Sequence, residues 1–309
     1  MRTREAPIRN ALEYGAARLL VAVASLLPRA WIPGFCAALG RVGWWFLGGR
    51  RRVVRDNLRL AYRGASDAPR ADVVGPASVA NLVQSFLELF LMPADPDAVR
   101  ATLVQFRGPT PKEIEARFDG APCIWAAAHF GAWEVLGSAG PLLGFDVTTL
   151  VRPLDNPRLQ EWVARKRTQF GAQLAASRGG LADLVAAVEE RRQVAVLADL
   201  NHRGRGAAFI DFFGVKAATA RTIAVLALKY DRPVIPVFCH RMPDGRFGFD
   251  TGTPIVPDRS APYDTEVHRI LQDVADAIEM RVREHPGAWL WTHRRWKTRP
   301  AEETGSASV

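Results

Sequence analysis

The stretch PCIWAAAHFGAWE, residues 122–134, places two titratable side chains after a buried strand. Residues 123–128 form a short, continuous apolar run, which is typical of a strand covered on both faces. His129 follows this run directly, and Glu134 comes five positions later in sequence that suits a helix. Because open α/β sheets bind ligands at the carboxyl ends of their strands, the order predicts an α/β fold with His129 at a site.

The same alternation continues along the chain. Further runs of strand composition lie at residues 145–151, 194–199, 233–240 and 246–252, the last of which alternates like an edge strand. Helix-length segments lie at residues 134–144, 156–171, 180–193, 219–231 and 264–286. This pattern predicts a mainly parallel mixed sheet covered by helices.

The first hundred residues have a different character. Residues 51–64 predict a basic helix that ends at Gly64, and residues 78–93 predict a strongly apolar helix. We therefore divide the chain into three parts. They are a helical membrane-associating region (1–100), an α/β domain that contains His129 (101–300) and a polar tail that we expect to be disordered (301–309).

Three interpretations compete for the apolar N-terminus. Its longest uncharged runs, 19–28 and 30–40, are shorter than the ~20 residues of a spanning helix. The segment is therefore a secretory signal, one imperfect transmembrane helix, or two helices that lie on one leaflet and meet at residues 27–33. We favour the helix pair, with the basic run 48–55 facing anionic headgroups on the cytoplasmic side of the inner membrane.

The composition is typical of a protein that binds a membrane surface or an acidic partner. The net charge is +9, the sequence pI is about 10.1, and the nine tryptophans gather near the two ends of the chain. We expect the terminal tryptophans to anchor at an interface, and we expect no nucleic-acid partner. Three widely spaced cysteines favour a reducing compartment over a disulfide framework.

The His129–Glu134 pair suggests a general base. A carboxylate on one imidazole nitrogen fixes the tautomer and raises the basicity of the other nitrogen. Gly131 lets a substrate approach the backbone closely. A histidine at a helix start and a glutamate paired with an arginine would give the same spacing, and the spacing alone favours that simpler interpretation.

Other chemistries fit the sequence less well. It contains no G-x-S-x-G elbow, no H-E-x-x-H motif, no P-loop and no dinucleotide fingerprint. A metal site made of His129, Asp199 and His202 is conceivable, but we favour neither a metal nor a cofactor. A base without its own nucleophile suits direct attack by an acceptor hydroxyl on an acyl thioester.

Four sequence blocks together resemble one family. AAHFGAWE (127–134) looks like an H-x4-[DE] motif, and LVRPLDNPRLQEWVARKR (150–167) resembles an arginine-proline block. Residues 194–238 contain an Asp-bearing strand end and an F-F-G segment, and PGAWLWTHRRWKTRP (286–300) resembles a C-terminal signature. The chain is thus similar to the lipid A biosynthesis late acyltransferases of the lysophospholipid acyltransferase superfamily.

The resemblance implies a mechanism. His129 would deprotonate an acceptor hydroxyl, Glu134 would orient His129, and no covalent enzyme intermediate would form. The donor would be an acyl carrier protein or coenzyme A thioester, and the acceptor a lipid A precursor or another glycolipid such as a phosphatidylinositol mannoside. The implied binding residues are Gly131, Arg152, Asp199, Lys216, Arg294, Arg295 and Lys297.

Two departures bear on the acceptor. Ala132 stands where many relatives have Asn, and Leu200 stands where Gln commonly follows the Asp. Two other functions stay open at this stage. One is a thioesterase or lysolipid hydrolase in which water replaces the acceptor, and the other is a non-catalytic lipid-binding protein with the same cleft.

Overall fold

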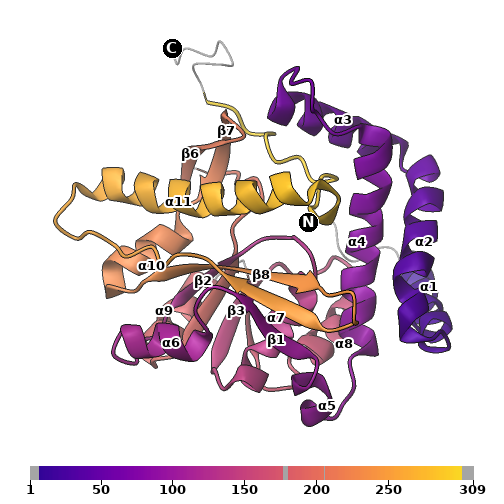
Figure 1. The fold of residues 1–309 in the computed structure, drawn as a ribbon, viewed down its shortest axis with the longest axis horizontal. Helices are drawn as coiled ribbons and strands as arrows, with labels where there is room; N and C mark the ends of the chain where they lie inside the picture. Colours follow the sequence, from indigo (N-terminus) through magenta and orange to yellow (C-terminus); the bar gives the residue numbers. More distant parts are fainter. Residues whose placement is uncertain (1–6, 177–179, 205, 301–309) are drawn as a thin grey trace.

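The computed structural model describes residues 7–176, 180–204 and 206–300 (Figure 1). Four helices form a layer along one side of the α/β body: α1 (Pro7–Ser25), α2 (Ile32–Phe46), α3 (Gly48–Tyr62) and α4 (Ala71–Leu91). A short 3-10 turn, η1 (Arg29–Trp31), joins the first two. The predicted pair of helices meeting at residues 27–33 is therefore present, and so are the two helices predicted after it.

Helix α4 is the centre of this layer. In the part of the chain that the structure describes, α4 alone is long and apolar enough to cross a membrane, and half of its most apolar window is buried against protein. Gly40 lets α2 approach closely, because a Cβ there would lie 2.4 Å from the carbonyl oxygen of Pro76. The Trp44 ring in turn fills the space over Gly75. Helix α4 thus packs as a core helix.

The sheet has the order β1-β9-β8-β2-β5-β3-β4 among the described residues. Its strands are β1 (Leu103–Arg107), β2 (Ile124–Ala127), β3 (Val147–Val151), β4 (Gln173–Ala176), β5 (Gln193–Leu197), β8 (Val234–Arg241) and β9 (Phe247–Thr251). The strands from β8 to β4 are parallel, whereas β9 and β1 run the opposite way. The predicted mainly parallel mixed sheet is confirmed. The edge assignment for 246–252 is wrong, because β1 pairs with the outer side of β9.

Alternate residues of the central strands pack into two hydrophobic cores, one on each face of the sheet. Ile124 and Ala126 of β2 pack toward the face covered by α9 (Gly180–Glu189), α10 (Thr222–Tyr230) and α11 (Tyr263–Glu284). Trp125 and Ala127 pack on the other face with α6 (Pro111–Arg117) and α7 (Trp133–Ala139). Helices α5 (Pro96–Arg100) and α8 (Pro157–Arg167) complete the body. Burial on both faces explains the continuous apolar runs of the sequence.

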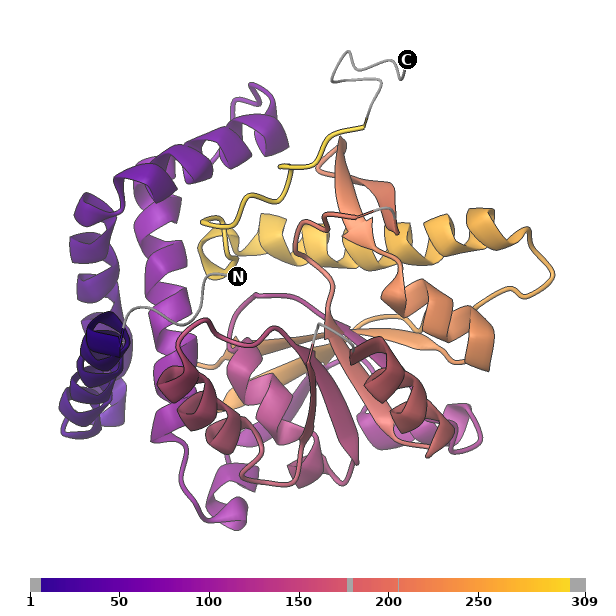
Figure 2. The ribbon, with the colours of Figure 1, turned by 180° about the vertical axis from the view of Figure 1, so that it is seen from behind.

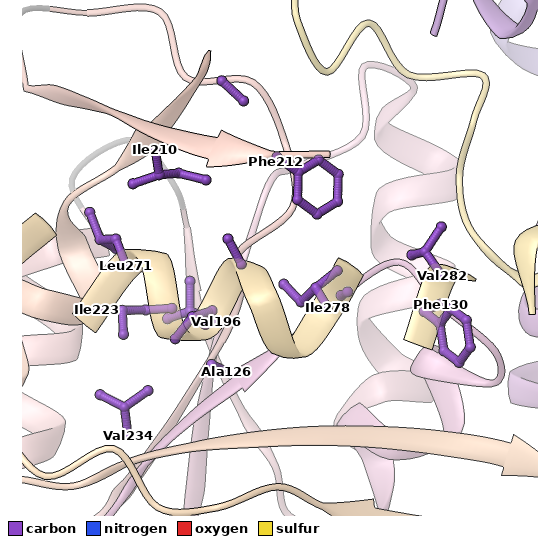
Figure 3. Packing of buried hydrophobic residues seen from close by; sticks show 14 of the residues in the cluster. Ala126, Phe130, Val196, Ile210, Phe212, Ile223, Val234, Leu271, Ile278 and Val282 are labelled. Atoms are coloured by element: carbon purple, nitrogen blue, oxygen red, sulfur yellow. The ribbon is translucent and has the colours of Figure 1, made fainter. Parts of the chain in front are cut away.

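A two-stranded hairpin lies outside the main sheet. Strands β6 (Ala207–Phe212) and β7 (Val215–Ala220) pair antiparallel and pack on α11. Figure 3 shows Ile210 and Phe212 on one side of α11 and Val234 of the main sheet on the other. The sequence did not predict this hairpin, because β7 is contiguous with the helical stretch that becomes α10.

The predicted boundary near residue 100 falls between α5 and β1. The helical layer is nevertheless packed on the body, since α4 contacts α7, α8 and the turn η3 (Pro286–Ala288). The chain after α11 runs between α3 and the hairpin (Figure 2). The predicted disordered tail, residues 301–309, lies outside the described residues.

Candidate active site

His129 is held by an aspartate from the neighbouring strand end. The Nδ1 atom of His129 lies 2.9 Å from Oδ1 of Asp199, and the backbone N–H of His129 donates to Oδ2 at 3.0 Å. Because a carboxylate is an acceptor, it fixes the tautomer with the proton on Nδ1. The lone pair on Nε2 is then the basic position. The His129 side chain is 17% exposed.

The strand order brings these two residues together. His129 follows β2 and Asp199 follows β5, which are adjacent and parallel although the residues are 70 positions apart. The carboxyl ends of both strands therefore meet at one edge of the sheet, where α/β proteins bind ligands. The backbone N–H of Ala198 donates to the carbonyl of Ala127 at 2.8 Å, which extends the strand pairing up to the site.

Asp199 is kept ionised in a buried place. Its side chain is fully buried, and Nε1 of Trp289 donates to Oδ2 at 2.8 Å. Burial alone would raise the pKa of Asp199, but the charge of His129 and hydrogen bonds from His129 and Trp289 outweigh burial and lower it. In a general-base reaction, an ionised Asp199 would stabilise the imidazolium form of His129.

The turn after His129 requires glycine. Gly131 has φ +61°, and a Cβ there would lie 2.1 Å from the carbonyl oxygen of Cys239. Three hydrogen bonds fix the backbone of this turn. The N–H of Gly131 donates to the carbonyl of Ala288, and the N–H of Ala132 donates to the carbonyl of Cys239. The Arg241 side chain donates to the carbonyl of Gly131 at 3.3 Å. We expected Gly131 to let a substrate approach the backbone, but strand β8 fills the space that a Cβ at this position would take.

Glu134 is bound to an arginine, which corrects the predicted His129–Glu134 contact. Arg167 of α8 donates to both Glu134 oxygens, at 2.7 and 2.9 Å, and Trp133 donates to one of them. Glu134 lies in the first turn of α7, turned toward α4 and α8, where its backbone N–H donates to Ser85. Asp199 takes the place at Nδ1, so Glu134 orients the helix and the loop rather than the imidazole.

The other predicted binding residues are dispersed. Arg152 follows β3, but β5 lies between β3 and β2, and the Arg152 side chain is exposed beside Asp155. Lys216 lies on the hairpin and pairs with Asp211 at 3.0 Å. The structure therefore brings neither cation to His129. Asp199, which the resemblance implied as a binding residue, is the residue that it does bring there.

Residues 286–300, which we call the C-terminal bracket, hold their three tryptophans inside the protein rather than at an interface. Trp289, Trp291 and Trp296 are almost completely buried, which corrects their predicted role at a membrane. Arg295 is also wrong as a headgroup contact, because it is 1% exposed and donates to the carbonyls of Leu200 and Ala218. Burial lowers its pKa to about 10.

The helical layer holds this bracket in place. Asn57 of α3 donates to the carbonyls of Trp291 and His293, and Ser78 of α4 donates to the carbonyl of Trp289. The Trp289 side chain then reaches Asp199. The N-terminal helices, the C-terminal bracket and the His129–Asp199 dyad therefore form one connected network. The sequence pattern did not reveal the contacts that Arg167 and Trp289 make, although both residues lie in the blocks that carry the resemblance.

Nucleophilic and metal chemistry find little support in the described part of the chain. It holds no group of three or more His, Cys, Asp or Glu side chains placed to share a metal. His202 donates its backbone N–H to Ala218 on the hairpin rather than joining His129 and Asp199 in a ligand set. Burial raises the pKa of Cys36, Cys123 and Cys239, so their thiols are unreactive.

Comparison with known proteins places this chain in a family. Residues 6–298 match the sequence profile of the bacterial lipid A biosynthesis acyltransferases. The chain belongs to this family. It is therefore an acyltransferase, as the resemblance of the four sequence blocks implied, and the dyad joins His129 of the first block to Asp199 of the third.

Several family members are similar over most of their length. A lipid A biosynthesis lauroyltransferase of Escherichia coli K12 is 24% identical over 268 residues, which cover 85% of this chain and 84% of that protein. A palmitoleoyltransferase of the same organism is 23% identical over 271 residues, covering 86% and 85%. A lipid A biosynthesis acyltransferase of Haemophilus influenzae is 24% identical over 196 residues, covering 60% and 57%.

Proposed function

We propose that this enzyme transfers a fatty acyl chain from an acyl thioester to a hydroxyl group of a lipid A precursor or a closely related glycolipid. The observation that carries the proposal is the buried His129–Asp199 dyad at the carboxyl ends of β2 and β5. Such a dyad supplies a general base without a protein nucleophile. The names of the relatives, which transfer lauroyl and palmitoleoyl groups, support the substrate class.

The reaction follows from the dyad's geometry. Nε2 of His129 accepts the proton of the acceptor hydroxyl as its oxygen attacks the thioester carbonyl. Asp199 stabilises the imidazolium, and the tetrahedral intermediate collapses to an ester while the carbon–sulfur bond breaks. The proton on His129 then passes to the departing thiolate. The acyl group moves directly from donor to acceptor, and the base returns to its starting state.

The donor is an acyl carrier protein thioester in this proposal, with coenzyme A thioesters as the alternative. The net charge of +9 favours an acidic carrier protein through electrostatic steering. The acyl carrier protein is then the partner that delivers the chain, and no cofactor takes part.

The enzyme works at a membrane surface in this proposal. Ile8, Leu12, Leu19 and Val23 of α1 are exposed, and at about 100° per residue they lie within an arc of about 60° on one side of the helix. Such a narrow apolar stripe suits insertion into one leaflet. The basic start of α3, residues 48–55, would then face anionic headgroups of the cytoplasmic leaflet of the inner membrane.

The test uses the purified full chain, a radiolabelled acyl carrier protein thioester and a lipid A precursor in detergent micelles. We expect labelled lipid product, and loss of at least 10³-fold in rate for His129→Ala, because the general base and its charge-stabilised partner act as one unit. Full activity of His129→Ala would refute the mechanism. Release of free fatty acid in place of labelled lipid would identify a hydrolase, and lipid binding without turnover a carrier.

A further inference from the structure

An open pocket of about 510 Å³ lies where α2 passes into α3, beside the C-terminal bracket. Leu47, Gly48 and Arg50 form its wall on the helical layer. Its opposite wall carries Arg203, from the loop after β5, together with Arg294 and Lys297 of the bracket. Figure 2 follows these two segments, α3 and the chain after α11, as they run side by side.

The pocket gathers cations without matching anions. Four of its lining side chains, Arg50, Arg203, Arg294 and Lys297, are positively charged and exposed, and no carboxylate lines it. None of the four forms an ion pair with another described residue, whereas most exposed arginines on α8 and α11 do. Converging, unneutralised cations in a concavity attract a compact polyanion. Three arginines favour phosphate, which guanidinium binds with two parallel hydrogen bonds.

The pocket is rigidly connected to the dyad. Arg203 comes four residues after Asp199, and the loop between them is fixed by Asn201, which exchanges hydrogen bonds with Thr298 of the bracket. Nε2 of His293, next to Arg294, accepts from the backbone N–H of Asn201 at 3.2 Å. The segments that carry the pocket cations are therefore the segments that hold Asp199. An anion bound there is placed at a set position relative to His129.

The rim of the pocket continues into an apolar surface. Phe46 lines the pocket and is 84% exposed, and its neighbour Trp45 is 77% exposed. Exposed aromatic side chains next to converging cations suit the boundary between acyl chains and headgroups. An anion reaching the pocket past this rim would be part of a lipid. A soluble carrier protein would need no such apolar margin.

We propose that this pocket binds a phosphate group of the glycolipid acceptor, and so holds the acceptor hydroxyl at Nε2 of His129. The inference rests on the proposed function, because it assigns the acceptor's headgroup to a subsite of the same reaction. The pocket selects phosphorylated over neutral glycolipids. It does so by binding, while the dyad supplies the chemistry.

The test compares Arg294→Gln/Lys297→Gln with a matched control, Lys112→Gln/Arg117→Gln, which removes the same charge from α6 on the far side of the body (Figure 1). Initial rates are measured in neutral detergent against a lipid A precursor and the same lipid after phosphatase treatment. We expect the pocket variant to raise KM for the phosphorylated lipid at least tenfold with little change in kcat. Both the parent enzyme and the variant should show the same high KM for the dephosphorylated lipid.

Other results would overturn the proposal. An unchanged KM for the phosphorylated lipid would do so, as would an equal loss in the α6 control or a KM effect confined to the acyl carrier protein. If no enzyme transfers acyl groups to either lipid, the proposed function fails. The role of the pocket is then tested by equilibrium binding of the two lipids to the parent chain and to the variant. Tighter binding of the phosphorylated lipid by the parent chain alone supports the proposal, and equal binding in all four cases refutes it.

Discussion

Two buried carboxylates lie on either side of the turn that begins with His129, and they are used differently. Asp199 is paired with His129, whose side chain can gain and lose a proton. It also accepts a hydrogen bond from the side-chain N–H of Trp289. Glu134 is paired through two hydrogen bonds with a permanently charged arginine. The first arrangement can move a proton and the second cannot. Asp199, 70 residues from His129 in sequence, is therefore placed to support the proposed chemistry, whereas Glu134 within the motif supports the structure.

Asp199→Asn is the sharpest way to break this comparison, and it has the largest expected effect. The amide retains the shape but not the charge that stabilises the imidazolium, so we expect kcat to fall by about 10³- to 10⁴-fold. The melting temperature should change by only a few degrees. Steady-state kinetics and a thermal melt measure the two effects. A variant that keeps more than a tenth of the parent activity would contradict the role of Asp199.

Glu134→Gln should show the opposite balance. It leaves the Arg167 guanidinium buried without a counter-charge, which costs about 3 kcal/mol of unfolding free energy. The folded fraction should keep its kcat within about tenfold. Denaturant unfolding at neutral pH measures the loss.

A second variant controls for the ion pair itself. Glu134→Leu/Arg167→Met removes both charges, so it should lose less stability than the sum of the single changes, by about 1–3 kcal/mol. A stable Glu134→Gln enzyme with activity as low as Asp199→Asn would reverse the assignment and restore the sequence-based pairing of Glu134 with His129.

The smallest expected effect is a pH dependence of stability, and it should distinguish the Asp199 side of the site from Glu134. Burial lowers the pKa of His293 from 6.5 to about 4, so the unfolded chain binds a proton at a pH where the folded chain does not. The free energy of unfolding should therefore fall as pH drops from about 6.5 to about 4, by at most about 1.4 kcal/mol per pH unit. Asp199, with its lowered pKa, loses its contribution only at still lower pH.

His293→Gln should flatten this slope, because its amide oxygen can accept the Asn201 N–H but does not titrate. Glu134→Gln should keep the slope. Unfolding curves from pH 4 to pH 7 decide the point, and equal slopes in the parent chain and His293→Gln would assign the pH dependence to another group.

The sequence predicted the local features well because they depend on local pattern. Continuous apolar runs marked β2 and β5, and their ends located His129 and Asp199. What failed was non-local. The motif suggested that His129 pairs with its neighbour Glu134, since no periodicity in one sequence reveals that β5 inserts beside β2.

Burial of large side chains was also beyond local reasoning. Both ends of the chain are rich in tryptophan and arginine, and the same composition predicted interface anchors at each. Trp45 is exposed on the helical layer, whereas Trp289 is enclosed by α4 and the hairpin. Arg295 is likewise buried because carbonyls from two other segments happen to converge on it. Such partners are set by tertiary packing rather than by neighbours in sequence.

The sequence separation of the dyad residues has a consequence for the protein during its synthesis. His129 precedes Asp199 by 70 residues, and Trp289 follows 90 residues after that. During synthesis the imidazole emerges from the ribosome long before either partner, so a nascent or prematurely terminated chain carries a histidine without the carboxylate and the tryptophan that hold it in place. On the proposed mechanism, such fragments would lack the complete dyad that activates a hydroxyl group or a water molecule. The enzyme would become competent only when nearly the whole chain has been made and folded.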